Sequence, residues 1–172
     1  TPFVAGVSDA SIGVVGASQH PSFVRNGLIL SEALAVAHLR LLHAEAGRVP
    51  ALRGAARLVR RWAAARGYAA YGQHVSSFQL TLALLHVSRA EPALAKDDFA
   101  LFRALIDWLA RTDLTEKPFV VAATKEQSRA YLAAVSAIRT SNGAPAAYLI
   151  EPFVGANVLY DWSAETAAVL RH

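Results

Sequence analysis

The chain has 172 residues, which suits a single domain with a sizeable core over residues 1–172, preceded by a loosely ordered lead-in at residues 1–10. Apolar residues make up 54% and charged residues 17%, so the surface must also be partly apolar, which favours a homo-oligomer or a large partner interface. The absence of cysteine excludes disulfides, thiolate metal sites and cysteine nucleophiles. No apolar run has the length of a transmembrane helix and no signal pattern opens the chain, so we expect a cytoplasmic protein without membrane contact.

In chain order, the spacing of apolar and turn-forming residues predicts strands that alternate with helices. The predicted strands are residues 11–17, 78–88, 119–123 and 146–154, and the predicted helices are residues 21–46, 49–66, 97–110, 126–140 and 164–171. This alternation predicts an α/β domain with a doubly wound parallel sheet and helices on both faces. Ligands in that architecture bind beyond the carboxyl ends of the strands, where residues 18–22, 88–96 and 124–128 would lie.

Residues 78–88 fit two patterns. Phe78, Leu80 and Leu82 alternate with Gln79 and Thr81 as they would in a strand, while the density of leucines also suits a buried helix. Because the polar residues fall on one face of an extended chain, the pattern favours a strand.

The turn at residues 18–22 is the main candidate for a ligand site. It follows an apolar run and opens a long helix, so its hydroxyls and backbone N–H groups would lie at the partly positive helix end, where a phosphate is stabilised. The alternative is that Ser22 only caps an ordinary helix.

Four segments then resemble the NAD(P)H-dependent FMN reductases of the flavodoxin-like fold, most of all those that supply reduced flavin to monooxygenases attacking sulfonates and sulfones. Residues 14–22, Val-Val-Gly-Ala-Ser-Gln-His-Pro-Ser, resemble that family's first strand and phosphate loop. Residues 100–109 resemble its Gly-Leu-Phe-Lys helix, and residues 116–124 resemble its Gly-Lys-Pro-strand-Ala-Ala-Thr segment. Residues 151–156 fall at its last strand and following loop.

The resemblance implies a flavodoxin-like domain that transfers hydride from NAD(P)H to FMN and passes electrons to a flavin-dependent monooxygenase or another acceptor. The cofactor carries that chemistry, so no catalytic side chain is expected. The implied cofactor-binding residues are Ser18, Ser22, Arg25 and Asn26 at the phosphate with His20 nearby, Pro92 in the loop that faces the flavin ring, and Thr124 and Ser128 at the polar edge of the ring.

A concentration of arginines supports a different class of function. The net charge is +4 and six arginines fall within one short segment: Arg48, Arg53, Arg57, Arg60, Arg61 and Arg66. Such a segment can hold nucleic acid or a phosphorylated cofactor, or it can be a solvated face or a subunit contact. The alternatives to a reductase are therefore a flavin-free relative acting as a binding module, and a helical, self-assembling, coat-type protein that binds nucleic acid.

The remaining polar residues indicate no further site. His38 and His43 are five residues apart on a predicted helix and point to different sides, so they do not form a metal site. Asp97 and Asp98 are adjacent, which suits a helix cap better than a pair of acid and base catalysts.

Overall fold

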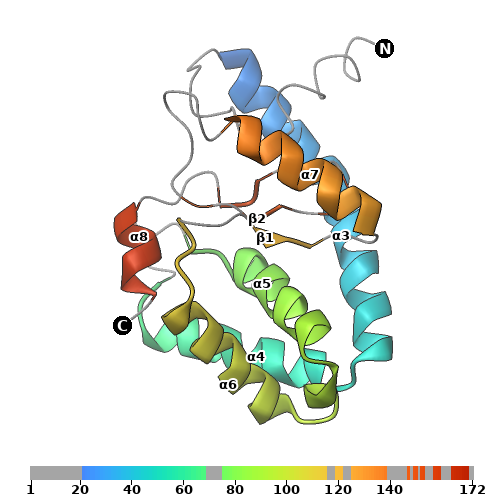
Figure 1. Ribbon diagram of the computed structural model, residues 1–172, viewed down its shortest axis with the longest axis vertical. Helices are drawn as coiled ribbons and strands as arrows, with labels where there is room; N and C mark the ends of the chain where they lie inside the picture. Colours follow the sequence, from blue (N-terminus) through green and yellow to red (C-terminus); the bar gives the residue numbers. More distant parts are fainter. Residues whose placement is uncertain are drawn as a thin grey trace.

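The computed structural model describes residues 21–68, 75–115, 119–121, 125–138, 147, 149–150, 152–153, 157–159 and 164–170. The elements along the chain are α3 (Pro21–Arg48), α4 (Ala51–Ala65), α5 (Ser77–Ala90), the 3-10 helix η2 (Pro92–Leu94), α6 (Asp98–Arg111), β1 (Phe119–Val120), α7 (Lys125–Ile138), β2 (Leu149–Ile150) and α8 (Ala164–Val169). Helices α4, α5 and α6 pack together at one end, and the two strands lie between α5 and α7 (Figure 1).

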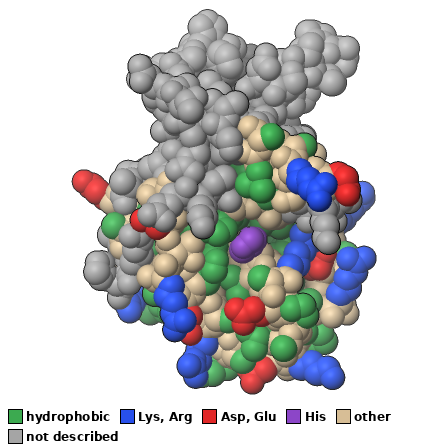
Figure 2. Space-filling view, viewed as in Figure 1, with side chains coloured by type: hydrophobic (Ala, Val, Ile, Leu, Met, Phe, Trp, Pro, Cys, Tyr) green, Lys and Arg blue, Asp and Glu red, His purple; other side chains and the backbone are tan. Residues whose placement is uncertain are grey.

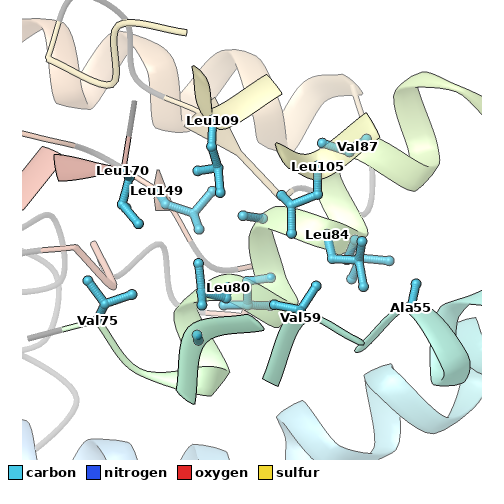
Figure 3. Packing of buried hydrophobic residues seen from close by; sticks show 14 of the residues in the cluster. Ala55, Val59, Val75, Leu80, Leu84, Val87, Leu105, Leu109, Leu149 and Leu170 are labelled. Atoms are coloured by element: carbon cyan, nitrogen blue, oxygen red, sulfur yellow. The ribbon is translucent and has the colours of Figure 1, made fainter. Parts of the chain in front are cut away.

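The core lies between α4, α5 and α6. Fully buried leucines come from α5 (Leu80, Leu84) and α6 (Leu105, Leu109), and Val59 of α4 meets them (Figure 3). The buried positions of α6 recur every four residues, which places them on one stripe of that helix. The three helices therefore form a bundle with one continuous apolar interior.

Helix α5 corrects the prediction of a strand over residues 78–88. The Ser76 hydroxyl accepts the Gln79 N–H at 3.2 Å, and Gln79 Oε1 accepts the Ser76 N–H at 2.7 Å, which forms a capping box at the helix start. Residues from Leu82 to Leu85 are all buried, so this central helix is apolar on almost every side and shows no helical period. The alternation that favoured a strand was accidental.

Helices α4 and α6 run side by side in the same direction. The Ala51 N–H at the start of α4 donates to the carbonyl of Ala95, just before α6, at 3.0 Å. One turn later, Gly54 faces Asp98, and a Cβ at position 54 would overlap the Asp98 carboxylate. Glycine at this position therefore leaves room for the Asp98 carboxylate between the two helices.

The strand region is small and depends on one buried amide. β1 and β2 are parallel, with Phe119 opposite Leu149 and Val120 opposite Ile150. Asn157, only 4% exposed, accepts the N–H groups of Leu149 and Leu159 and donates to the carbonyl of Ala147, at 2.9–3.1 Å.

One side chain ties this region to the bundle. Gln79 Nε2 donates to the Val158 carbonyl at 2.7 Å, so the residue that caps α5 also holds the segment beside Asn157.

The prediction of a doubly wound flavodoxin-like sheet is wrong. Within the described residues the sheet has two strands of two residues each, and helices supply the core. The helices predicted from residues 21, 49, 97, 126 and 164 are confirmed with small shifts of their ends, and short strands do form within residues 119–123 and 146–154. The strand predicted at residues 11–17 lies outside the described residues. No described helix is both long and apolar enough to cross a membrane.

Candidate nucleic-acid interface

Helix α4 has one buried and one basic face. Five residues face the core, namely Ala51, Leu52, Ala55, Val59 and Ala63. On the opposite side, Arg53, Arg57, Arg60 and Arg61 are exposed, and helical geometry at 3.6 residues per turn places all four within an arc of about 100°. We call these four residues the arginine face.

Helix α4 ends at a glycine, and the last arginine of the segment, Arg66, is exposed to solvent. Gly67 has a positive φ of 73°, and the Tyr68 N–H donates back to the Ala63 carbonyl at 3.0 Å. This is the left-handed stop that glycine favours at a helix end. Tyr68 then turns inward against Trp62, with ring centroids 5.2 Å apart, while Arg66 stays exposed.

The charge of this segment is not neutralised locally. Residues 51–66 hold five arginines and no acidic residue, which leaves 12 basic residues against 13 acidic ones in the rest of the chain. Residues 51–66 thus carry the entire positive excess of the protein. In the part of the chain that the structure describes, the arginine face forms no ion pair.

Two nearby arginines serve a different purpose. Arg89 of α5 contacts the carboxylate of Glu45 on α3 at 2.7 Å, and Arg48 reaches the same oxygen at 3.5 Å. Glu45 is 7% exposed, so its charge requires these partners. Arg89 thus joins α5 to α3, whereas Arg48 pairs with Glu45 within α3.

A ring cluster joins the bundle to β1. His86 of α5 lies 5.5 Å from Trp108 of α6 and 5.4 Å from Phe119 of β1, measured between ring centroids. Burial lowers the pKa of His86, a hydrogen bond with the Val120 backbone opposes the shift, and nearby Arg89 adds to it. The imidazole therefore acts as a neutral packing group at neutral pH. On the side of the molecule shown in Figure 2, a histidine lies among hydrophobic side chains, with basic side chains toward the edges.

One cavity in the described interior is too small for an organic ligand. A cavity lined by Leu80, Trp108 and Leu149, among others, has a volume of about 10 Å³ and admits about one water molecule. Among the described residues, no three His, Asp or Glu side chains are grouped so that they could hold a metal ion.

Most of the residues predicted to bind a cofactor have no described side chain, so their arrangement is not tested. Ser18, His20 and Thr124 lie outside the described residues, and Ser22, Arg25 and Asn26 fall in the first turns of α3, where only the backbone is described. Pro92 is exposed in η2, and Ser128 is half-buried in α7. FMN and NAD(P)H binding through these residues stays an untested prediction that rests on the resemblance alone.

The arginines of α4 were visible in the sequence, but their common exposure was not. Their spacing at positions 53, 57 and 61 indicates one helix face, and alanines at the alternate positions fill the buried side. The exposure of Phe99 on α6 was missed, because aromatic residues on an amphipathic helix are usually assigned to the core.

Comparison with known proteins then identifies the family. The family model of the Nrap protein PAP/OAS-like domain matches residues 51–172, from the first residue of α4 onward. No curated protein and no solved structure is similar enough to count as a match.

This match overturns the resemblance to FMN reductases, whose motifs were short and generic, and with it the expected reductase function. The two alternatives, a flavin-free relative and a coat-type protein, fit the match no better, and the expected monooxygenase partner loses its basis. Because the match covers most of the chain, the protein belongs to the family of Nrap protein PAP/OAS-like domains, which are of the nucleotidyltransferase type.

Proposed function

We propose that this domain binds RNA through its phosphate backbone, on the arginine face of α4. The observation that carries the proposal is the unneutralised row of exposed arginines on a helix whose other side is fixed in the core. Family membership supports it, since Nrap proteins are nucleolar and associated with RNA.

The geometry suits a charged strand. Arg53, Arg57 and Arg61 follow one another at intervals of four residues, so the row extends over about 12 Å at 1.5 Å per residue. A nucleic-acid strand presents one phosphate about every 3.4 Å along the axis of a duplex, so this row can meet several phosphates at once. The guanidinium groups can each form two parallel hydrogen bonds to a phosphate.

The buried side of α4 makes the surface rigid. Ala55 and Val59 are fully buried, and small residues allow the neighbouring helices to approach closely. The arginines are thus held by a fixed backbone, and binding orders only their side chains. This lowers the entropic cost of binding.

The test is the affinity for a short fluorescein-labelled oligouridine, measured by fluorescence anisotropy with the whole 172-residue chain. Arg57→Ala with Arg61→Ala should weaken binding by at least tenfold. The slope of log affinity against log salt should also fall by about 1.4, because a single strand loses about 0.7 per phosphate contact.

The control is Arg40→Ala with Arg129→Ala, which removes the same charge from exposed positions on α3 and α7. We expect this control to change the affinity about twofold or less, since these two charges lie outside the face. Equal losses in both double variants would show that net charge alone attracts RNA, and the proposal would be wrong.

A further inference from the structure

An exposed aromatic side chain lies at the start of α6, the helix that packs beside α4. Phe99 is 59% exposed although it belongs to the first turn of an otherwise well-packed helix. Its ring is 6.2 Å from that of Phe102 at an interplanar angle of 40°, and Phe102 packs against the core. Most of this ring is therefore accessible to a flat partner.

The arrangement of α4 and α6 brings this ring to the arginines. The two helices run in the same direction and begin next to each other, because the Ala51 N–H donates a hydrogen bond to the Ala95 carbonyl and Gly54 faces Asp98. Phe99 follows Asp98, and Arg57 lies one turn beyond Gly54, so helix geometry places both positions along the seam between the two helices.

The backbone of Phe99 is held in place. The Phe99 N–H donates to Asp97 Oδ1 at 2.9 Å, and the Ala100 N–H donates to the same oxygen at 2.8 Å. This cap fixes the first turn of α6, and Phe102 supports one side of the Phe99 ring. A ring fixed in this way loses little conformational freedom when a flat partner lies on it.

We infer that Phe99 stacks on a nucleobase of a single-stranded nucleic acid whose phosphates lie on the arginine face. This inference rests on the proposed function and adds the class of ligand to it. Positive charge beside an exposed aromatic ring is the combination that binds single strands, because every base presents a flat face, whereas the bases of a duplex are stacked on one another. The arginines of α4 favour this polyanion over an apolar protein segment. Of the two carboxylates at the start of α6, that of Asp97 already accepts hydrogen bonds from the Phe99 and Ala100 N–H groups, and that of Asp98 lies against Gly54.

The experiment compares Phe99→Ala, Phe99→Trp and Leu39→Ala, using anisotropy with labelled oligouridine. Leu39 is the matched control, since it is 58% exposed on α3 and away from the seam. Phe99→Ala should weaken binding by about 5- to 150-fold, the range for loss of one stacked base. Phe99→Trp should bind at least as well as the original chain, and Leu39→Ala should bind equally well.

A second probe separates bases from phosphates. An abasic oligomer of the same length keeps the phosphates, so Phe99→Ala should not change its binding, and the salt dependence should match that of the original chain. With the intact oligomer, the Phe99→Trp variant should also show quenching of the new tryptophan on binding. Far-ultraviolet circular dichroism confirms that each variant is folded.

The outcomes for the two proposals differ. If Phe99→Ala leaves binding to oligouridine unchanged, or weakens the intact and abasic oligomers equally, base stacking is wrong and the exposed ring belongs to another occupant such as a protein. Loss of binding in the arginine variant alone would then leave the backbone proposal standing. If the arginine variant also binds normally, both proposals fail.

Discussion

The three-helix bundle and the strand region are stabilised in different ways. In the bundle, leucines of α5 and α6 and small residues of α4 bury a continuous apolar interior, which requires volume and shape. The strand region has two residue pairs. The buried side-chain amide of Asn157 forms hydrogen bonds with backbone N–H and carbonyl groups in and next to the short strands. One region therefore depends on many interchangeable contacts, and the other on a few hydrogen bonds with no substitute.

The largest expected effect is in the bundle. Leu105→Ala removes a fully buried side chain from the centre of α6 and leaves a cavity, so the free energy of unfolding should fall by about 2–5 kcal/mol. Urea titration followed by circular dichroism measures this. Leu39→Ala, at an exposed position, is the control and should change stability by about 0.5 kcal/mol or less. Similar losses in both would contradict the assignment of the core.

The next effect is at Asn157. Asn157→Ala leaves two buried N–H groups and one carbonyl without partners, which should cost about 1–3 kcal/mol. Hydrogen exchange should accelerate at Leu149 and Leu159 before it accelerates in α5 or α6. Uniform acceleration through the whole chain would show that the two regions unfold as one unit.

A smaller effect separates a structural arginine from an exposed one. Arg89→Ala leaves the buried Glu45 carboxylate with only its longer contact to Arg48, and should cost about 1–2 kcal/mol. Arg48→Ala should cost about 0.5 kcal/mol or less, because the Arg48 side chain is 77% exposed. Thermal unfolding of both variants at low and high salt measures the two losses of stability. An equal shift in Tm for Arg89→Ala and Arg48→Ala would contradict the expectation that Arg89 contributes more.

The smallest expected effect is a pH dependence of stability caused by His86, which lies where the bundle and the strands meet. Burial lowers the pKa of His86 below the ordinary value of 6.5, so between these two values the unfolded chain binds more protons than the folded one. Its contribution to stability is complete above pH 6.5 and is lost as the pH falls toward the lowered pKa.

The test is His86→Phe, which should flatten the stability curve in that range relative to the original chain. Phenylalanine keeps the ring contacts with Trp108 and Phe119 while removing the proton site. An unchanged slope would mean that other groups cause the pH dependence.

The sequence predicted the amphipathic helices well, because α4 and α6 each show one apolar stripe. It failed at α5, where burial on nearly every side removes the period that distinguishes a helix from a strand. The Ser-x-x-Gln spacing of Ser76 and Gln79 was the available signal for a helix start.

The fold class and the reductase function were mispredicted for a related reason. Short apolar runs at residues 119–123 and 146–154 do contain strands, but a run of this kind does not specify how many strands share its sheet. The arginines were noticed, yet their common exposure depends on how α4 packs against α5 and α6, which the sequence does not show. Such exposure is a property of tertiary packing.

The contact between Gly54 and Asp98 has a consequence for the evolution of the family. Because a side chain at position 54 would occupy the space of the Asp98 carboxylate, a residue larger than glycine there requires the Asp98 side chain to turn away if α4 and α6 keep their spacing. In relatives with this helix pair, a larger residue at the position of Gly54 should accompany a shorter one at the position of Asp98. Paired substitution at these two sites would therefore mark the members of the family that retain the seam.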